Sequence, residues 1–135
     1  MNFNQMKYTA VFLLILTFGL FSCKKAGLNG KATLVISPVH HSIHAVSQNS
    51  YRDSVYLFFN TKDLPAGPLS NADAIFTGVP GEDDVRCENL HAGNYFLFVA
   101  AWDTTRNVRV SGGMAVTVKF KERKQEINIE VPVIE

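Results

Sequence analysis

Residues 95–102 read YFLFVAAW and form the most apolar segment of the chain after residue 23. The segment is eight residues long, which is usual for a strand and short for a helix. Gly93 stands before it and Asp103 after it, and both residue types commonly flank regular structure. Its length and aromatic content together predict a central β-strand.

The sequence on both sides of this segment predicts further strands and no helix after residue 23. Apolar residues occupy every second position over longer stretches, which is the period of a strand. These stretches are residues 31–37, 53–60, 114–120 and 127–133. Shorter candidates are residues 72–77, 85–88 and 108–110. The pattern predicts an all-β fold, a single antiparallel β-sandwich of about seven strands with an immunoglobulin-like arrangement, after an N-terminal signal helix.

Proline and glycine are expected to limit two of these strands. Alternation predicts which side chains share a face of a strand. Pro38 should end the first strand, and Ser111-Gly112-Gly113 should interrupt the chain before residues 114–120. In residues 114–120 the even-numbered side chains, the last of which is Phe120, are expected to share one face of a strand. Residues 53–60 carry apolar side chains on both faces, which predicts a strand covered on both sides or near the rim of a sandwich.

The first 23 residues have the pattern of a bacterial lipoprotein signal. Residues 8–21 contain no charge and would span ~21 Å as a helix, whereas a bilayer core is ~30 Å thick. The run therefore has the length of a signal-peptide core. At its end, Leu20-Phe21-Ser22-Cys23 resembles the lipobox of bacterial lipoproteins, in which an aliphatic, a tolerant and a small position precede an obligatory cysteine.

The lipobox resemblance implies cleavage between Ser22 and Cys23 and lipidation of Cys23. Several acyl chains would make the anchoring stable, because a single chain binds a membrane only marginally. Residues 1–22 are then the signal peptide, residues 23–30 the lipidated cysteine and a tether, and residues 31–135 the folded domain. Two other interpretations stay open, an ordinary secretory signal with an incidental cysteine and a short membrane anchor.

Residues 81–103 carry a second resemblance. An acidic, glycine-containing turn and a short strand lead into Leu90, Gly93 and Tyr95, and the apolar central strand follows. This order is similar to that of transthyretin-like sandwiches, which include the carboxypeptidase regulatory-like domains and their relatives in bacterial surface proteins. We expect Leu90 to fill the core at a strand end, Gly93 to permit a tight or φ-positive turn, and Tyr95 to pack between the sheets.

Three histidines gather in the weakly patterned segment HHSIHAVSQ at residues 40–48, which is either an edge strand or a loop. Imidazole is a good ligand for Zn²⁺ or Cu²⁺, so His40, His41 and His44 are candidate metal ligands. In a straight strand His40 and His44 would share a face and His41 would point away. The other interpretation is a polar edge or loop that contains histidines without a metal.

Charge and cysteine content narrow the function classes. Without residues 1–22 the chain has equal numbers of acidic and basic residues, which does not favour a nucleic-acid partner. With Cys23 lipidated, Cys87 has no cysteine to pair with, and we expect it to be a buried, inert thiol. The chain contains no nucleophile elbow, phosphate-binding loop, zinc-protease motif or dinucleotide fingerprint.

Three function hypotheses follow. The first is a non-enzymatic lipoprotein of the bacterial envelope that acts as a binding or accessory module, with an unknown envelope protein or glycan as its partner. The second is an envelope metal-binding protein that uses His40, His41 and His44, and the third is an enzyme of unknown class. Lys24 is not the acidic residue that retains lipoproteins at the inner membrane in well-studied bacteria, so the lipoprotein resemblance implies the outer membrane and leaves the periplasmic and surface faces open. An exposed Trp102 would suit a platform for stacking a sugar.

Overall fold

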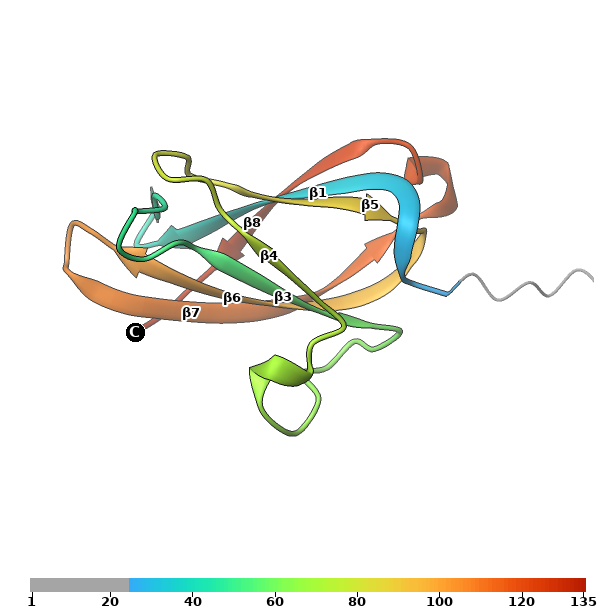
Figure 1. Ribbon diagram of the computed structural model, residues 1–135, viewed down its shortest axis with the longest axis horizontal. Coiled ribbons are helices and arrows are strands. Elements are labelled where there is room, and N and C mark those ends of the chain that lie inside the picture. Colours follow the sequence, from blue (N-terminus) through green and yellow to red (C-terminus); the bar gives the residue numbers. More distant parts are fainter. Residues whose placement is uncertain (1–24) are drawn as a thin grey trace, which may run out of the picture.

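The computed structural model describes residues 25–135, which form a sandwich of two sheets (Figure 1). The predicted all-β class is confirmed, and among these residues there are eight strands and two 3-10 turns. The strands are β1 (Leu28–His40), β2 (Ile43–His44), β3 (Ser54–Phe59), β4 (Ala74–Thr77), β5 (Val85–Leu90), β6 (Gly93–Asp103), β7 (Val108–Val118) and β8 (Glu126–Pro132). The turns are η1 (Leu69–Asn71) and η2 (Phe120–Glu122).

One strand pair departs from the purely antiparallel expectation. The second sheet has the order β4-β3-β6-β7, and all of its pairs are antiparallel. In the first sheet β1 pairs antiparallel with β2 and β5, but it pairs parallel with β8, from Thr33↔Glu126 to Val39↔Pro132. The reason is the connection through η2, which carries the chain from the second sheet to the first, so that β8 runs in the direction of β1 (Figure 1).

The predicted central strand is the middle of the second sheet. β6 lies between β3 and β7, and its register with β3 runs from Ser54↔Ala100 to Phe59↔Tyr95. Its inward side chains are fully buried, as are the core residues opposite them in the other sheet. The fully buried set includes Leu34, Ile36, Val55, Leu57, Val85, Tyr95, Leu97, Val99 and Val131. Along β1 and β8 the alternating apolar residues face the core, as the strand period predicted.

Two expected strand breaks are absent from the structure. β1 continues through Pro38 to His40, because the Pro38 carbonyl still accepts a hydrogen bond, from the backbone N–H of Ala45 (2.9 Å). β7 continues through Gly112 and Gly113. A Cβ on Gly112 would collide with the Pro132 carbonyl. These glycines therefore serve close packing rather than a turn.

The prediction that Phe120 shares a strand face with Val118 was wrong. β7 ends at Val118, and the chain then turns into η2. Phe120 lies in this turn, and 51 % of its surface is exposed. An alternating pattern predicts a face only as far as the strand continues, and here it continued in the sequence beyond the strand.

The sandwich has two ends that carry different groups. The proximal end, where the described chain begins, contains Ala26, Gly27, Leu90, Gly93 and the segment 119–125. The distal end is defined by His40, Tyr51, Asp53, Trp102 and Asp103. β6 runs from one end to the other, from Gly93 to Asp103, which is ~33 Å for ten residue steps. The last residue of the chain lies toward the distal end (Figure 1).

Candidate functional site

The proximal end is closed by a buried tyrosine hydroxyl. Tyr95 is fully buried, and its hydroxyl donates to the His91 carbonyl (2.7 Å) and accepts from the Gly27 N–H (3.0 Å). Burial raises the pKa of Tyr95. The Asn60 side-chain oxygen accepts from the Ala26 N–H (2.9 Å). The first described residues are therefore joined to the sandwich by hydrogen bonds, and the tether expected as far as Gly30 is shorter, since β1 begins at Leu28.

Leu90 and Gly93 also lie at the proximal end, where the first described residues pack against the sandwich. Leu90 is fully buried, as expected. Gly93 has the expected positive φ, 159°, but its backbone is close to extended and does not form a left-handed turn. A Cβ at Gly93 would lie 2.5 Å from the backbone nitrogen of Ala26. The glycine is required because the first described segment packs directly against the start of β6.

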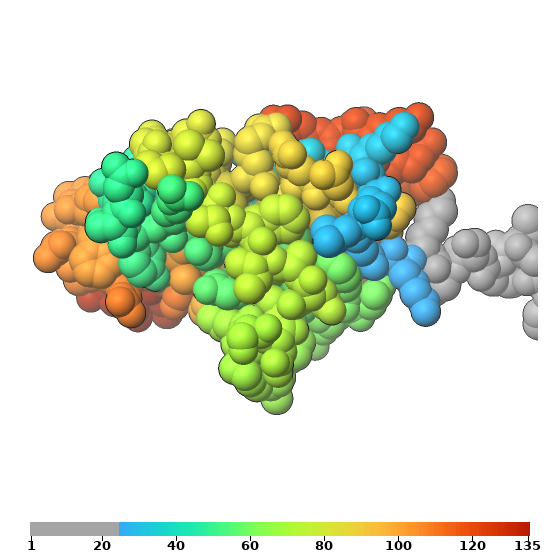
Figure 2. Space-filling model, viewed as in Figure 1, coloured from blue at the N-terminus to red at the C-terminus, as the bar shows by residue number. Residues whose placement is uncertain are grey.

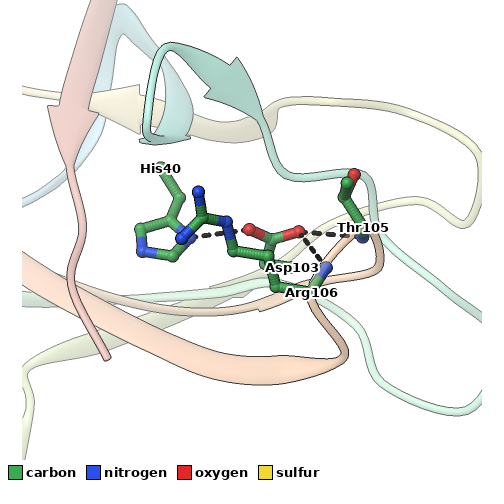
Figure 3. A network of polar contacts seen from close by, with 4 residues as sticks. All are labelled: His40, Asp103, Thr105 and Arg106. Atoms are coloured by element: carbon green, nitrogen blue, oxygen red, sulfur yellow. Dashed lines mark hydrogen bonds and ion pairs between the residues drawn. The ribbon is translucent and has the colours of Figure 1, made fainter.

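The distal end contains a buried histidine–aspartate pair (Figure 3). His40 Nδ1 lies 2.6 Å from Asp103 Oδ2, and both side chains are 5 % exposed. The other carboxylate oxygen, Oδ1, accepts backbone N–H groups from Thr105 (2.8 Å) and Arg106 (3.1 Å). The hydrogen bond from His40, followed by these backbone bonds, lowers the pKa of Asp103. Because an ionised carboxylate can only accept, Nδ1 carries the proton and Nε2 is left for a ligand.

Of the three predicted metal ligands, the structure brings two together. His40 and His41 have ring centroids 4.3 Å apart. Together with Glu135 they form a group whose ligand atoms all lie within 4.8 Å of one another. His44 instead places Nδ1 3.0 Å from Asp83 and Nε2 3.5 Å from Glu130. The hydrogen bond to Asp83 is the main cause that raises the pKa of His44.

A tight hairpin separates the histidines. Residues 40–44 contain a strand end, a turn and β2, so both alternatives for this segment are present in part. His41 and Ser42 have φ angles of 48° and 65°, which is the pattern of a type I′ hairpin turn. His44 consequently pairs with Val39 on the opposite strand and does not share a strand face with His40. The prediction from a straight strand did not include this hairpin. It also did not include Asp103 and Glu135 as residues of the site, because they are distant from the histidines in the sequence.

A polar groove with two aromatic rings lies at the same end. The ring centroids of Tyr51 and Trp102 are 5.7 Å apart, and the guanidinium of Arg109 lies 5.5 Å from the Tyr51 ring centroid. The groove has a volume of about 400 Å³. Its remaining lining residues are Gln48, Ser50, Thr104 and Asn107. Trp102 is half-buried, so one part of the ring is accessible.

Asp53 is a second buried carboxylate at the distal end, and its surroundings differ from those of Asp103. It is fully buried, and neither carboxylate oxygen has a hydrogen-bond partner among residues 25–135. Burial raises the pKa of Asp53 to about 6, an effect that the nearby Trp102 backbone and Ser47 hydroxyl offset only in part. The Ser47 hydroxyl accepts the Asp53 backbone N–H (3.0 Å). The carboxylate lies in the core and not in the groove.

Cys87 is buried, and it is a free thiol within the described part of the chain. Burial raises its pKa to about 12, so the reactive thiolate is not formed near neutral pH. Ser22 and Cys23 lie outside the described residues 25–135. Within that range, no helix has the length and hydropathy of a membrane span.

The chain was compared with protein families, curated proteins and solved structures. No family model, no curated protein and no solved structure matches the chain.

Proposed function

We propose that this chain is a non-catalytic lipoprotein of a bacterial envelope, most compatible with the outer membrane, in which a transthyretin-like sandwich anchored through Cys23 presents its distal end to a ligand. One observation carries the proposal. The described chain begins at the proximal end, and the aromatic groove lies at the other end of β6, ~33 Å away. An anchor two residues before Lys25 therefore leaves the groove directed away from the bilayer.

A glycan is the ligand that this groove fits best. The rings of Tyr51 and Trp102 offer apolar faces for the C–H groups of a sugar, while Arg109 and Asn107 offer donors for its hydroxyls. The groove is small and contains no buried nucleophile beside a base, so binding is the chemistry that its side chains support.

The anchor is tested by replacing Cys23 with Ala. The wild-type protein should incorporate radiolabelled palmitate and partition with envelope membranes, and the Cys23→Ala variant should incorporate no label. Palmitate labelling of the variant at the wild-type level would contradict the lipobox reading.

The groove is tested with immobilised envelope glycans and the Trp102→Ala variant. Stacking on an aromatic ring typically contributes about 1 kcal/mol, so loss of the ring should weaken retention about fivefold. Phe98→Ala is the matched control, because Phe98 is also half-buried and lies on the same face of β6, outside the groove. Equal loss with both variants, or no glycan retention by the wild type, would contradict the proposal.

A second candidate function is the binding of a divalent metal ion at the distal end. The observation that favours it is the group His40, His41 and Glu135, together with the Asp103 carboxylate that fixes the ring of His40. A metal-bound imidazole usually donates its other N–H to a carboxylate. Three protein ligands with nitrogen and oxygen donors suit Zn²⁺ or Cu²⁺. This set replaces the predicted trio, because His44 is held by Asp83 and Glu130.

Titration of the mature protein with Zn²⁺ by calorimetry separates the two sets. His41→Ala and Glu135→Gln should each weaken binding at least tenfold, whereas His44→Ala should leave it unchanged. Asp103→Asn should weaken it about tenfold through the orientation of His40. An effect of His44→Ala as large as that of His41→Ala would contradict this set of ligands.

A further inference from the structure

A groove at the proximal end is lined by basic side chains. It has a volume of about 480 Å³. Its charged lining consists of Lys25, Lys31, Arg123 and Lys124, and no carboxylate lines it. It lies where the first described residues meet the turn before β8. Figure 2 shows these two segments, in blue and red, at the same end of the molecule.

The positive charge of this groove is local and uncompensated. Residues 25–135 contain eleven basic and twelve acidic residues, so the domain as a whole has a formal charge of −1 with neutral histidine. Among these residues no carboxylate forms an ion pair with Lys25, Lys31 or Lys124.

The nearest acidic residues of the same turn have other partners. Glu126 forms a two-point ion pair with Arg86, at 3.2 and 2.5 Å. The Glu122 carboxylate accepts the backbone N–H of Lys119 (2.9 Å) and so caps η2. Lys119 and Lys121 are exposed and stand next to Phe120 in the sequence, so the turn itself is rich in cations.

An exposed aromatic ring stands beside these cations. Phe120 is 51 % exposed. The Arg123 guanidinium lies 3.8 Å from its ring centroid and donates a hydrogen bond to the Phe120 carbonyl (2.9 Å). The turn is therefore ordered by its own contacts, with an apolar ring among basic groups. Cations with a neighbouring aromatic ring are typical of surfaces that contact the headgroup region of a bilayer.

We propose that this basic groove docks on the anionic headgroups of the membrane that holds the protein. The proposal rests on the proposed anchor at Cys23, which lies two residues before Lys25 and so at most ~7 Å along the chain. At that distance the groove is within one Debye length of the membrane surface, where charges interact with little screening. Docking would fix the sandwich with its distal groove pointing away from the bilayer.

The test uses the leaderless domain, residues 25–135, so that acylation plays no part. Among the described residues the core extends from Ala26 to Val133, so this domain keeps every one of those core contacts. A cooperative thermal transition by circular dichroism checks that each variant is folded. Sedimentation is measured with vesicles of phosphatidylcholine alone and with vesicles that contain about one third phosphatidylglycerol.

The wild-type domain should bind only the anionic vesicles and should be released by salt. The triple variant K25Q/K31Q/K124Q should bind about a hundredfold more weakly, since each cation near an anionic surface contributes about fivefold. The control R52Q/K62Q/R106Q removes three exposed cations outside the groove and should retain most of the binding. F120A should weaken binding several-fold.

Three results would overturn the docking surface. The first is equal binding to both kinds of vesicle, and the second is an equal loss in the control triple variant, which would show attraction by overall charge alone. The third is release by inorganic phosphate well beyond that by chloride at the same ionic strength, which would indicate a site for a free anion. None of these results would bear on the anchor at Cys23, because the tested domain does not contain that residue. In the same way, a failure of the palmitate test would not change the binding of vesicles by this domain.

Discussion

The two ends of the sandwich are closed by different chemistry. At the proximal end the polar groups that hold the first described residues are neutral, and they are the buried Tyr95 hydroxyl and the amide of the exposed Asn60. At the distal end they are ionisable, with His40 and Asp103 paired and Asp53 without a partner among residues 25–135. Neutral groups keep their hydrogen bonds over a wide pH range, whereas buried carboxylates and histidine respond to pH. The proximal end is therefore suited to a fixed attachment, and the distal end to contact with a ligand.

The largest effect is expected from Gly93→Ala at the proximal end. The new Cβ would lie 2.5 Å from the Ala26 nitrogen, so the first described segment or β6 has to move, at a cost of about 3 kcal/mol in the free energy of unfolding. Gly27→Ala is the matched control, because its Cβ would meet no atom closer than 3.9 Å. Urea denaturation measures both. Equal stability of the two variants would show that the proximal end is not tightly packed.

The next effect is expected from Tyr95→Phe. The variant leaves the partly buried Gly27 N–H and His91 carbonyl without their hydroxyl partner, which should reduce stability by about 2 kcal/mol. The loss should be the same at pH 5 and pH 8, because the groups involved are neutral. Tyr56→Phe serves as control, since Tyr56 is only half-buried. A loss that changes with pH would remove the distinction between the two ends.

Asp103→Asn should have a smaller and pH-dependent effect at the distal end. The lowered pKa of Asp103 means that its contribution is present above the unfolded pKa of about 4 and is lost as pH falls through the folded value. At pH 7 the variant should be less stable by about 1.5 kcal/mol. The difference should shrink as the pH is lowered toward 2. Denaturation curves at several pH values would contradict this if the difference stayed constant.

Asp53→Asn should cause the smallest change in the free energy of unfolding, and it should stabilise the protein rather than destabilise it. The pKa of Asp53 is raised to about 6, so ionisation destabilises the folded state fully above pH 6 and not at all below about 4. The amide should therefore stabilise the protein at pH 8 by about 1 kcal/mol, which is less than the full shift because its donors also need partners. No change should be seen at pH 4. Destabilisation at pH 8 would mean that the ionised carboxylate is well accommodated.

Much of the fold could be predicted because alternation is a local signal. The inward residues of β1 and β8 follow from period two, and the apolar segment at residues 95–102 is the centre of its sheet. The errors came from proline and glycine. Pro38 keeps an accepting carbonyl inside β1, and Gly112 makes room for β8. Proline and glycine therefore remain inside a strand where the neighbouring segment needs the proline carbonyl as an acceptor or the space left by the missing side chain of glycine.

The candidate sites were predictable only in part. The histidine cluster was visible in the sequence, but a two-residue turn separates His44 from it, and Asp103 and Glu135 lie beside it from distant parts of the chain. Trp102 was singled out, while Tyr51 and Arg109 stand in polar segments and join it only across the sheet. The register between strands decides which of their side chains become neighbours, and a single segment of sequence does not determine that register.

By itself, the sequence determined the all-β class and the inner faces of the long strands, because strand period and residue type act over a few neighbouring positions. It also carries the lipobox resemblance, a linear signal that needs no fold. Only the tertiary structure decided that β8 lies parallel to β1, that buried ionisable groups gather at the distal end, and that basic side chains from residues 25–31 and 119–124 line one groove. These features join distant parts of the chain, such as His40 and Asp103, which are 63 residues apart. They depend on how the two sheets are connected rather than on local preference.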